Sequence, residues 1–227
     1  MLSAPGIERP EPRWPAVIGV LAAAILHFAL PDDLRIGPPW LLVGLIVLLL
    51  IIAWGARHLG MHHVNAKAGY AILGVLTVGL LYGVTMLMTG LVRHTITAPE
   101  LLRAAAVLWA TNVLVFATWY WRLDAGGPND RERHAAHTSG AFLFPQMAVD
   151  APNTSAADRC DDATIAEVQG WRPGFVDYLF VAFNTSTAFS PTDVPVLSRW
   201  AKLTMMLQSV ISVTALVLLV GRAINIL

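Results

Sequence analysis

The chain has 227 residues, of which 56% are hydrophobic and 13% are charged, against roughly 25% charged in typical soluble domains. Lys and Arg together number 15, as do Asp and Glu, so the formal net charge is zero. A balanced chain without a basic arm offers nothing to nucleic acid, and we exclude DNA and RNA as partners. The mean hydropathy of +0.60 instead indicates a protein largely dissolved in lipid. The single cysteine, Cys160, excludes an intramolecular disulfide and a cysteine-based zinc site.

Four apolar segments in the first half of the sequence are long enough to cross a membrane, which takes about 20 helical residues. They lie near residues 14–30, 40–56, 70–92 and 101–121. Aromatic residues mark their ends, where amphipathic rings prefer the headgroup level: Trp14, Trp40, Trp54, Tyr70, Trp119, Tyr120 and Trp121. No small-x-small cleavage site ends the first segment, so we interpret it as an uncleaved anchor. Residues 1–121 therefore predict four transmembrane helices.

Two features inside these segments predict helix packing. Gly79 and Gly83 form a small-xxx-small pair, which lets another helix approach closely. Asn112 lies in the fourth segment, where its amide would face hydrocarbon unless it bonds to a neighbouring helix. We expect both features to hold helices together rather than to bind a ligand.

Residues 122–173 form the one extended hydrophilic region. It begins with a turn-rich stretch at 124–130 and contains a short apolar island at 142–145. The region is too short and too polar to bury a core of its own, so we expect a partly ordered loop rather than a domain. The island could fold back onto the membrane or a pore mouth.

Histidines provide the weak candidates for a metal site. His58 and His62 are four residues apart, which on a continuous helix would place both rings on one face, and His63 adjoins them. The intervening Gly60 and the lack of a nearby carboxylate favour a solvated interfacial group instead. A second grouping lies in the loop and consists of His134, His137, Asp158, Asp161 and Asp162. We expect neither metal nor cofactor, and keep a membrane-embedded metal-dependent enzyme only as a third hypothesis.

The last fifty residues follow the order of a pore loop. An apolar stretch at 175–183 leads into a hydroxyl-rich turn at 184–193 and then into an apolar helix near 200–224. Residues 175–189 would form about 22 Å of helix, short of a hydrocarbon core of about 30 Å. Lipid tolerates irregular backbone only where protein buries it or water lines it. We therefore predict a half-helix with a re-entrant loop, the alternative being that 175–189 crosses as a sixth span.

Residues 175–227 resemble the pore module of the potassium-channel superfamily, which consists of a pore helix, a filter and an inner helix. The pore-helix counterpart is DYLFVAFNTST at 177–187, and T-A-F-S-P-T-D at 187–193 stands where the superfamily has T-T-V-G-Y-G-D. Pro195 follows, and Arg199 and Lys202 open the last helix. The whole chain also resembles a family of bacterial predicted membrane proteins of unknown function that carry a similar STAFSPTD stretch.

The filter motif is altered at its centre. Ser190 and Thr192 replace the two glycines whose conformational freedom lets filter carbonyls point at the pore axis. Pro191 replaces the tyrosine and removes an N–H that could brace the filter. We expect the architecture of a potassium-channel pore module without its potassium selectivity. A monovalent cation would be attracted by the Asp193 carboxylate and would pass along side-chain hydroxyls. The hydroxyls are those of Thr185, Ser186, Thr187, Ser190 and Thr192. In the alternative, these groups only cap and close a half-helix.

Gln208, Ser209 and Ser212 lie within about one turn of each other on the last helix. In a homo-oligomer such as a tetramer they would line a vestibule, whereas in a monomer they would be hidden against the other helices. The sequence therefore predicts an all-α, multi-pass protein of the bacterial inner membrane. It is divided into a four-helix region (1–121), a hydrophilic loop (122–173) and a pore module (174–227).

The expected function is a non-selective or weakly selective cation channel rather than an enzyme, and a non-conducting membrane scaffold is the alternative. A pore loop that starts outside the cell would put the basic residues flanking the first four spans mainly outside. The positive-inside rule prefers the reverse orientation. Six full spans, with both termini in the cytoplasm, would satisfy the rule better.

Overall fold

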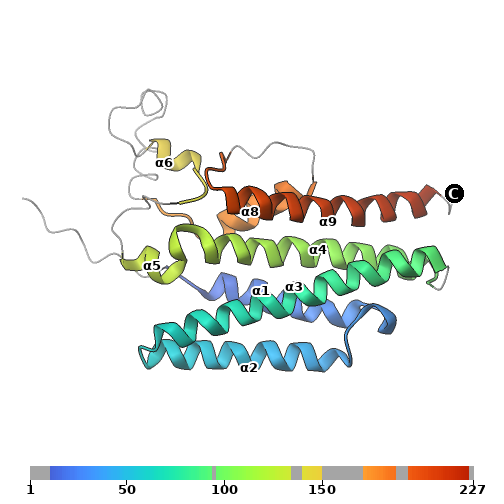
Figure 1. The fold of residues 1–227 in the computed structure, drawn as a ribbon, viewed down its shortest axis with the longest axis horizontal. Coiled ribbons are helices and arrows are strands. Elements are labelled where there is room, and N and C mark those ends of the chain that lie inside the picture. The colour runs from blue at the N-terminus through green and yellow to red at the C-terminus, as the bar shows by residue number, and fades with distance from the viewer. Residues whose placement is uncertain (1–10, 94–95, 134–139, 150–170, 188–193, 225–227) are drawn as a thin grey trace, which may run out of the picture.

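The computed structural model describes residues 11–93, 96–133, 140–149, 171–187 and 194–224. Throughout these ranges the regular elements are helices, and the only strand-like pairing is an isolated antiparallel bridge between Phe142 and Val196. The predicted all-α class is therefore confirmed for the described part of the chain (Figure 1).

The helices are, in chain order, α1 (Trp14–Leu26), α2 (Pro39–His58), α3 (His62–Arg93), α4 (Ala98–Leu123), α5 (Pro128–Arg133), α6 (Pro145–Val149), α8 (Phe175–Thr187) and α9 (Arg199–Ile224). Single 3-10 turns occur at η1 (His27–Ala29), η2 (Asp32–Leu34) and η3 (Asp124–Gly126). Among the described residues α2, α3, α4 and α9 are long and apolar enough to cross a membrane. The first predicted span is shorter than expected, because the apolar helix that contains α1 ends at Ala29.

Local sequence sets the helix boundaries. Prolines occupy the first turn of α1, α2 and α4, where the missing N–H costs nothing. Thr97 and Glu100 form a reciprocal capping box at the start of α4. Gly60, with φ of +69°, ends the α2 segment and allows the tight turn into α3.

The long helices run side by side and define two ends of the molecule (Figure 1). At one end, here called the loop end, α1, α3, α8 and α9 begin and α2 and α4 finish. Ion pairing of Arg131 with Glu11 (3.1 Å) and the bond from Asn65 Nδ2 to the Ala53 carbonyl (2.7 Å) join these termini. The opposite end, here called the turn end, carries residues 27–38 and the start of α4, where Arg103 donates to the Ala29 carbonyl.

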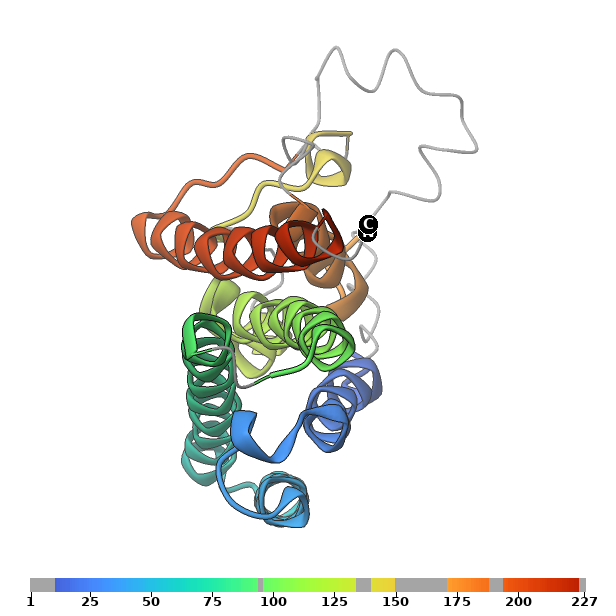
Figure 2. The same ribbon diagram turned by 90° about the vertical axis from the view of Figure 1, so that its right-hand side faces the viewer.

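The central helix is α4, which is packed by α1, α3, α8 and α9 (Figure 2). Close approach of α3 depends on glycine, because a methyl group at Gly83 would lie 2.7 Å from a Leu108 methyl of α4. A methyl at Gly79 would lie 3.2 Å from Leu42 of α2. The glycine pair thus packs as the sequence predicts, although its two members face different helices.

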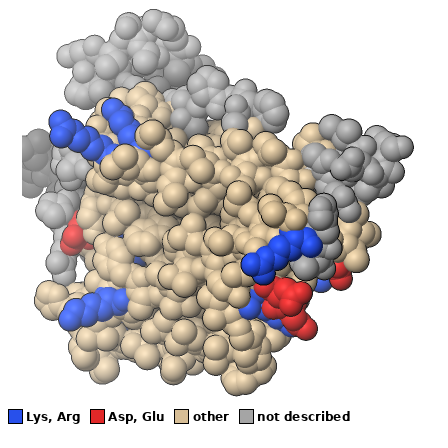
Figure 3. Space-filling model, turned by 45° about the vertical axis from the view of Figure 1, so that its right-hand side comes forward, with Lys and Arg blue, Asp and Glu red and all other residues tan. Residues whose placement is uncertain are grey.

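The outward faces of the long helices are apolar. Large exposed hydrophobic side chains on α2 include Leu48 and Ile51, and those on α9 include Leu203, Val210 and Val217. A broad face without charged side chains extends between charged margins (Figure 3). Exposed apolar surface of this extent suits lipid rather than water.

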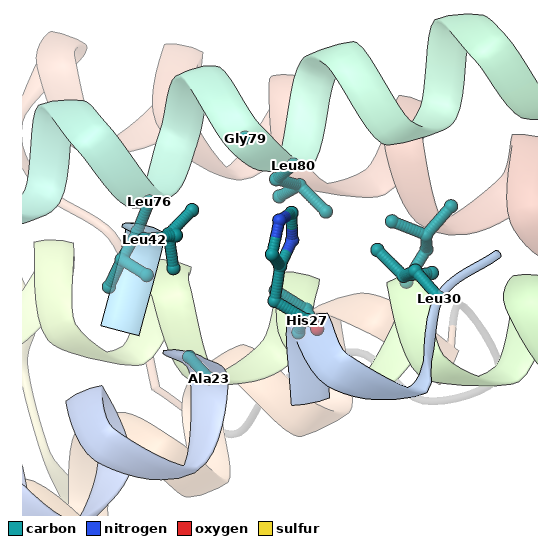
Figure 4. A pocket seen from close by; sticks show the side chains of 9 residues that line it. Ala23, His27, Leu30, Leu42, Leu76, Gly79 and Leu80 are labelled. Carbon is teal, nitrogen blue, oxygen red and sulfur yellow. The ribbon is translucent and has the colours of Figure 1, made fainter. Parts of the chain in front are cut away.

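One buried polar side chain sits inside the turn-end half of the bundle. His27 is 6% exposed and points into a cavity of about 10 Å³ between α1, α2, α3 and α4 (Figure 4). Leucines dominate its walls, and among the described residues Nε2 has no hydrogen-bond partner. The cavity has room for about one water molecule.

Candidate functional site

The half-length helix α8 begins at the same end of the bundle as α9. The Phe142 ring lies 6.0 Å from Tyr178, near the start of α8, and 6.2 Å from Trp200, near the start of α9. Eight residues further along both helices, Gln208 donates to Ser186. The two helices therefore run in the same direction, whereas consecutive full spans run in opposite directions, so the geometry argues against the sixth-span alternative.

The far end of α8 stops partway along α9. Thr187 is its last residue, and Thr185 accepts a bond from Ser209 of α9. Ser209 lies ten residues into α9, or about 15 Å along a helix of about 39 Å. With 13 residues, α8 spans about 20 Å, short of a hydrocarbon core of about 30 Å.

A buried junction holds the start of α8 at the loop end. The Asp124 carboxylate is fully buried and accepts bonds from the Tyr178 hydroxyl (2.7 Å) and from the Ala141 N–H. Arg131 donates to the carbonyls of Trp121 and Asp124, both at 2.8 Å, and its guanidinium lies 5.5 Å from the Tyr178 ring. Charge and hydrogen bonds together thus connect α4, α5 and α8.

The predicted apolar island closes this junction. Phe142 and Phe144 are 1% and 3% exposed, and Leu143 and Leu197 exchange backbone bonds with residues of the opposite segment. The island therefore folds back onto the protein, across the starts of α8 and α9, rather than extending away from it.

A second group of polar side chains is buried between α4, α8 and α9, and is here called the polar cluster. It consists of Asn112, Tyr120, Ser186, Gln208 and Ser212, all 0% exposed. The Gln208 amide donates to Ser186 Oγ and the Ala182 carbonyl, both at 2.7 Å, and its Oε1 accepts from the Tyr120 hydroxyl at 2.5 Å. Asn112 Nδ2 donates to Ser212 Oγ at 2.6 Å. These bonds fix the depth of α8 relative to α4 and α9.

Side chains donate hydrogen bonds to the carbonyl end of α8, where the last four carbonyls of a helix have no backbone N–H partner within it. Trp109 Nε1 donates to the Ser186 carbonyl at 3.4 Å, and Ser209 Oγ donates to the Thr185 carbonyl at 3.5 Å. Thr187 donates to the Asn184 carbonyl at 3.0 Å. A helix carries roughly half a negative charge at this end, so the partial negative charge of α8 lies beside Ser209, partway along α9.

The predicted site residues separate into three groups. Thr185, Ser186 and Thr187 form the last turn of α8, and Thr185 donates back to the Val181 carbonyl. Gln208 and Ser212 lie in the polar cluster, inside one subunit, while Ser209 is partly buried at its edge. The remaining filter-like residues, Ser190, Pro191, Thr192 and Asp193, lie outside the described residues.

The roles of two aromatic residues in this site were not predicted from the sequence. Tyr120 was expected at the headgroup level, but it is fully buried and its hydroxyl completes the polar cluster. Trp109 was not singled out, although it donates to the end of α8. The sequence signal for the polar cluster was Asn112, because a polar residue within an apolar segment predicts a hydrogen bond to a neighbouring helix at that level of α4.

The histidine candidates do not assemble as a helical pair. His58 ends α2 and His62 begins α3, so the Gly60 turn separates them. The His58 ring instead packs edge-on against Trp54 at 4.5 Å. Across the described ranges no three His, Cys, Asp or Glu side chains come together as a metal site would require. The loop grouping of His134, His137, Asp158, Asp161 and Asp162 lies outside those ranges.

Comparisons with protein-family models, with curated proteins and with solved structures found no significant match. The functional argument therefore depends on the geometry of α8 and its surroundings. The described part of the fold is helical, and four of its helices are long and apolar enough to cross a membrane.

Proposed function

We propose that this protein is a cation-conducting membrane protein of the re-entrant-loop type, active as a homo-oligomer. One observation supports this function above others. The helix α8 begins beside the start of α9 and stops about 15 Å along it, with its carbonyl end directed inward. In a membrane this end would lie in the hydrocarbon region, where its partial negative charge favours a cation.

The hydroxyl-rich segment that follows α8 would continue the cation path. Thr187 is the last residue of α8, and Ser190, Thr192 and Asp193 follow it in sequence. Hydroxyl and carboxylate oxygens are suitable partners for a cation at a constriction. Because the filter glycines are missing, the proposed path is non-selective or weakly selective among monovalent cations.

We propose an orientation with the loop end in the cytoplasm. Among the described residues, the basic ones at that end are Arg13, Arg57, Lys67, Arg122, Arg131, Arg133, Arg172, Arg199 and Lys202. Those at the turn end are Arg35, Arg93, Arg103 and Arg222. The excess at the loop end favours that side for the cytoplasm. The half-helix α8 would then enter the membrane from the cytoplasmic side, opposite to the orientation of potassium channels.

A non-conducting membrane scaffold is the second candidate, and a specific observation favours it. Gln208 bonds to Ser186 and Ser212 bonds to Asn112 inside one subunit. The outward face of α9 carries apolar residues such as Met206 and Val210. A polar vestibule built on Gln208 and Ser212 would require α9 to rotate. Under this alternative, the outward face of α9 contacts lipid or a membrane partner.

Cation flux from liposomes containing the purified protein tests the proposed function. We expect potassium and sodium efflux down a gradient, reduced at least about tenfold by Asp193→Asn, because a ring of carboxylates attracts cations to a pore. Thr187→Val tests the hydroxyl path. The matched control is Thr85→Val on α3, where an exposed Thr donates only to the Leu81 carbonyl at 2.8 Å. Absence of flux under any gradient, with a monomer in native mass spectrometry, would favour the scaffold.

A further inference from the structure

A cavity of about 620 Å³ lies at the loop end between α1, α2, α3 and α4. This volume is within the range of about 300–1,000 Å³ that is typical of small-molecule sites. It is separate from the polar cluster, because α8 and α9 contribute nothing to its lining.

The lining changes in character along the bundle axis. Three arginines line the cavity near the loop end, namely Arg13, Arg57 and Arg122. Deeper positions are apolar and include Val20, Leu50 and Ile72. The cavity therefore offers cationic groups at the membrane surface and hydrocarbon contacts below them, which matches an amphiphile with an anionic head.

Arg122 supplies the most strongly positioned of these charges. Its guanidinium donates to the carbonyls of Asn65 and Ala66, both at 3.0 Å, and lies 5.2 Å from the Tyr70 ring. These partners are neutral, so they orient the guanidinium without cancelling its charge. Gly69 makes the position possible, because a methyl group there would overlap the guanidinium.

The acidic residue in the lining does not offset this charge. Glu11 accepts bonds from Arg131 at 3.1 Å and from Trp121 Nε1 at 2.5 Å. Arg131 itself is not part of the lining. Because Glu11 is paired with this fourth arginine, it does not neutralise Arg122.

We propose that this cavity binds one anionic phospholipid, with its phosphate at Arg122 and an acyl chain between α1 and α2. Basic pockets between transmembrane helices are suited to anionic headgroups. Two tryptophans in the lining, Trp14 and Trp54, are each 67% exposed, and tryptophan prefers the headgroup level. The apolar wall distinguishes a lipid from free phosphate, which would leave Val20, Leu50 and Ile72 without a partner.

Native mass spectrometry with defined lipids tests this site. The full chain, purified in a neutral detergent, is titrated with phosphatidylglycerol or with phosphatidylcholine of the same acyl chains. We expect one phosphatidylglycerol to be retained with at least about tenfold preference, because both lipids carry a phosphate but the arginine-lined cavity repels the choline cation of phosphatidylcholine. Arg122→Gln removes the preference. The matched control is Arg103→Gln, which alters the same residue type at the turn end of α4, where Arg103 donates to the Ala29 carbonyl.

A glycine pair on α3 provides a second test that leaves every charge in place. Gly69→Ala displaces the Arg122 guanidinium and weakens phosphatidylglycerol retention, whereas Gly74→Ala, with nothing within 4 Å, leaves it unchanged. Equal retention of the two lipids by the wild-type protein would overturn the proposal. Unchanged preference in both Arg122→Gln and Gly69→Ala would do the same, as would displacement of the lipid by millimolar inorganic phosphate.

Discussion

At the scale of single residues, Gln208 does most to fix the half-helix. It bonds to Ser186 and to the Ala182 carbonyl, both on α8, and to Tyr120 of α4. Hydrogen bonds between helices in membranes contribute about 0.6 kcal/mol each on average, so three of them contribute roughly 2 kcal/mol. Their directionality adds specificity, because α8 can satisfy all of them at only one depth.

Replacing Gln208 by Leu is therefore expected to lower the free energy of unfolding by about 2 kcal/mol. Unfolding of the detergent-solubilised protein by increasing SDS measures the change. Ser209→Ala is the matched control on the same helix, because it loses one bond of 3.5 Å and is expected to cost less than about 0.6 kcal/mol. Equal stability of the two variants would show that the polar cluster does not hold α8.

In contrast to Gln208, His27 has a buried nitrogen, Nε2, without a hydrogen-bond partner among the described residues. Its Nε2 faces leucines in a cavity of about 10 Å³, and a buried group left unsatisfied costs about 1–3 kcal/mol. His27→Leu is expected to raise the free energy of unfolding by about 1 kcal/mol. Thermal unfolding in detergent measures the change, with Leu26→Met at the neighbouring position as control. A loss of stability would instead indicate that an ordered water satisfies the ring.

At the scale of elements, the close contact between α3 and α4 depends on glycine at position 83 of α3. A methyl group at Gly83 would meet a Leu108 methyl at 2.7 Å and the Leu34 carbonyl at 3.4 Å. Overpacking costs about 1–3 kcal/mol, partly offset by the better helix propensity of Ala, which is up to about 1 kcal/mol. Gly83→Ala is therefore expected to destabilise by about 1 kcal/mol in SDS unfolding.

A glycine about two and a half turns earlier in α3 gives a matched comparison. Gly74 lies on the same helix with nothing within 4 Å of an added methyl, so Gly74→Ala gains propensity without overlap. It should be as stable as the wild-type protein or slightly more stable. If both variants lose stability equally, the close approach of α3 and α4 at Gly83 is not the cause.

Hydropathy was sufficient to predict where most of the long helices lie, although the first helix is shorter than predicted and the short helices α5 and α6 were not predicted. The predicted half-helix at 175–189 corresponds to α8, and the spans near 40–56, 70–92 and 101–121 correspond to α2, α3 and α4. What hydropathy could not provide was the pairing of side chains across helices. A tyrosine near the end of an apolar segment, such as Tyr120, is typical of an interfacial anchor. Its hydroxyl bonds to Gln208 only because α9 packs beside α4.

The charged junction was missed for the same reason. Asp124 lies in a turn-rich stretch that typically faces water, yet it is fully buried. Its burial depends on Tyr178, which is 54 residues away in sequence. Sequence periodicity reports on the faces of a single helix, whereas a buried ionic group depends on contacts between distant segments.

At the scale of the whole molecule, the apolar outer face and the charged margins indicate how the protein sits in a bilayer. If α1, α2, α3, α4 and α9 all cross, the chain crosses five times and the two termini lie on opposite sides. With α8 as a sixth crossing, both termini would share one side. The half-helix therefore has a consequence that can be measured without a structure.

Reporter fusions measure this topology. With the loop end in the cytoplasm, a fluorescent protein fused after α5, at Arg133, is expected to fluoresce, because that reporter folds only inside the cell. Alkaline phosphatase fused to the C-terminus is expected to be active, because α9 runs from the loop end to the opposite side. The reciprocal fusions, phosphatase after Arg133 and fluorescent protein at the C-terminus, are the matched controls and should be silent. A fluorescent C-terminal fusion with an inactive phosphatase would place the C-terminus on the same side as Arg133. That result would require α8 to cross the membrane, and the half-helix with its proposed cation path would then have to be abandoned.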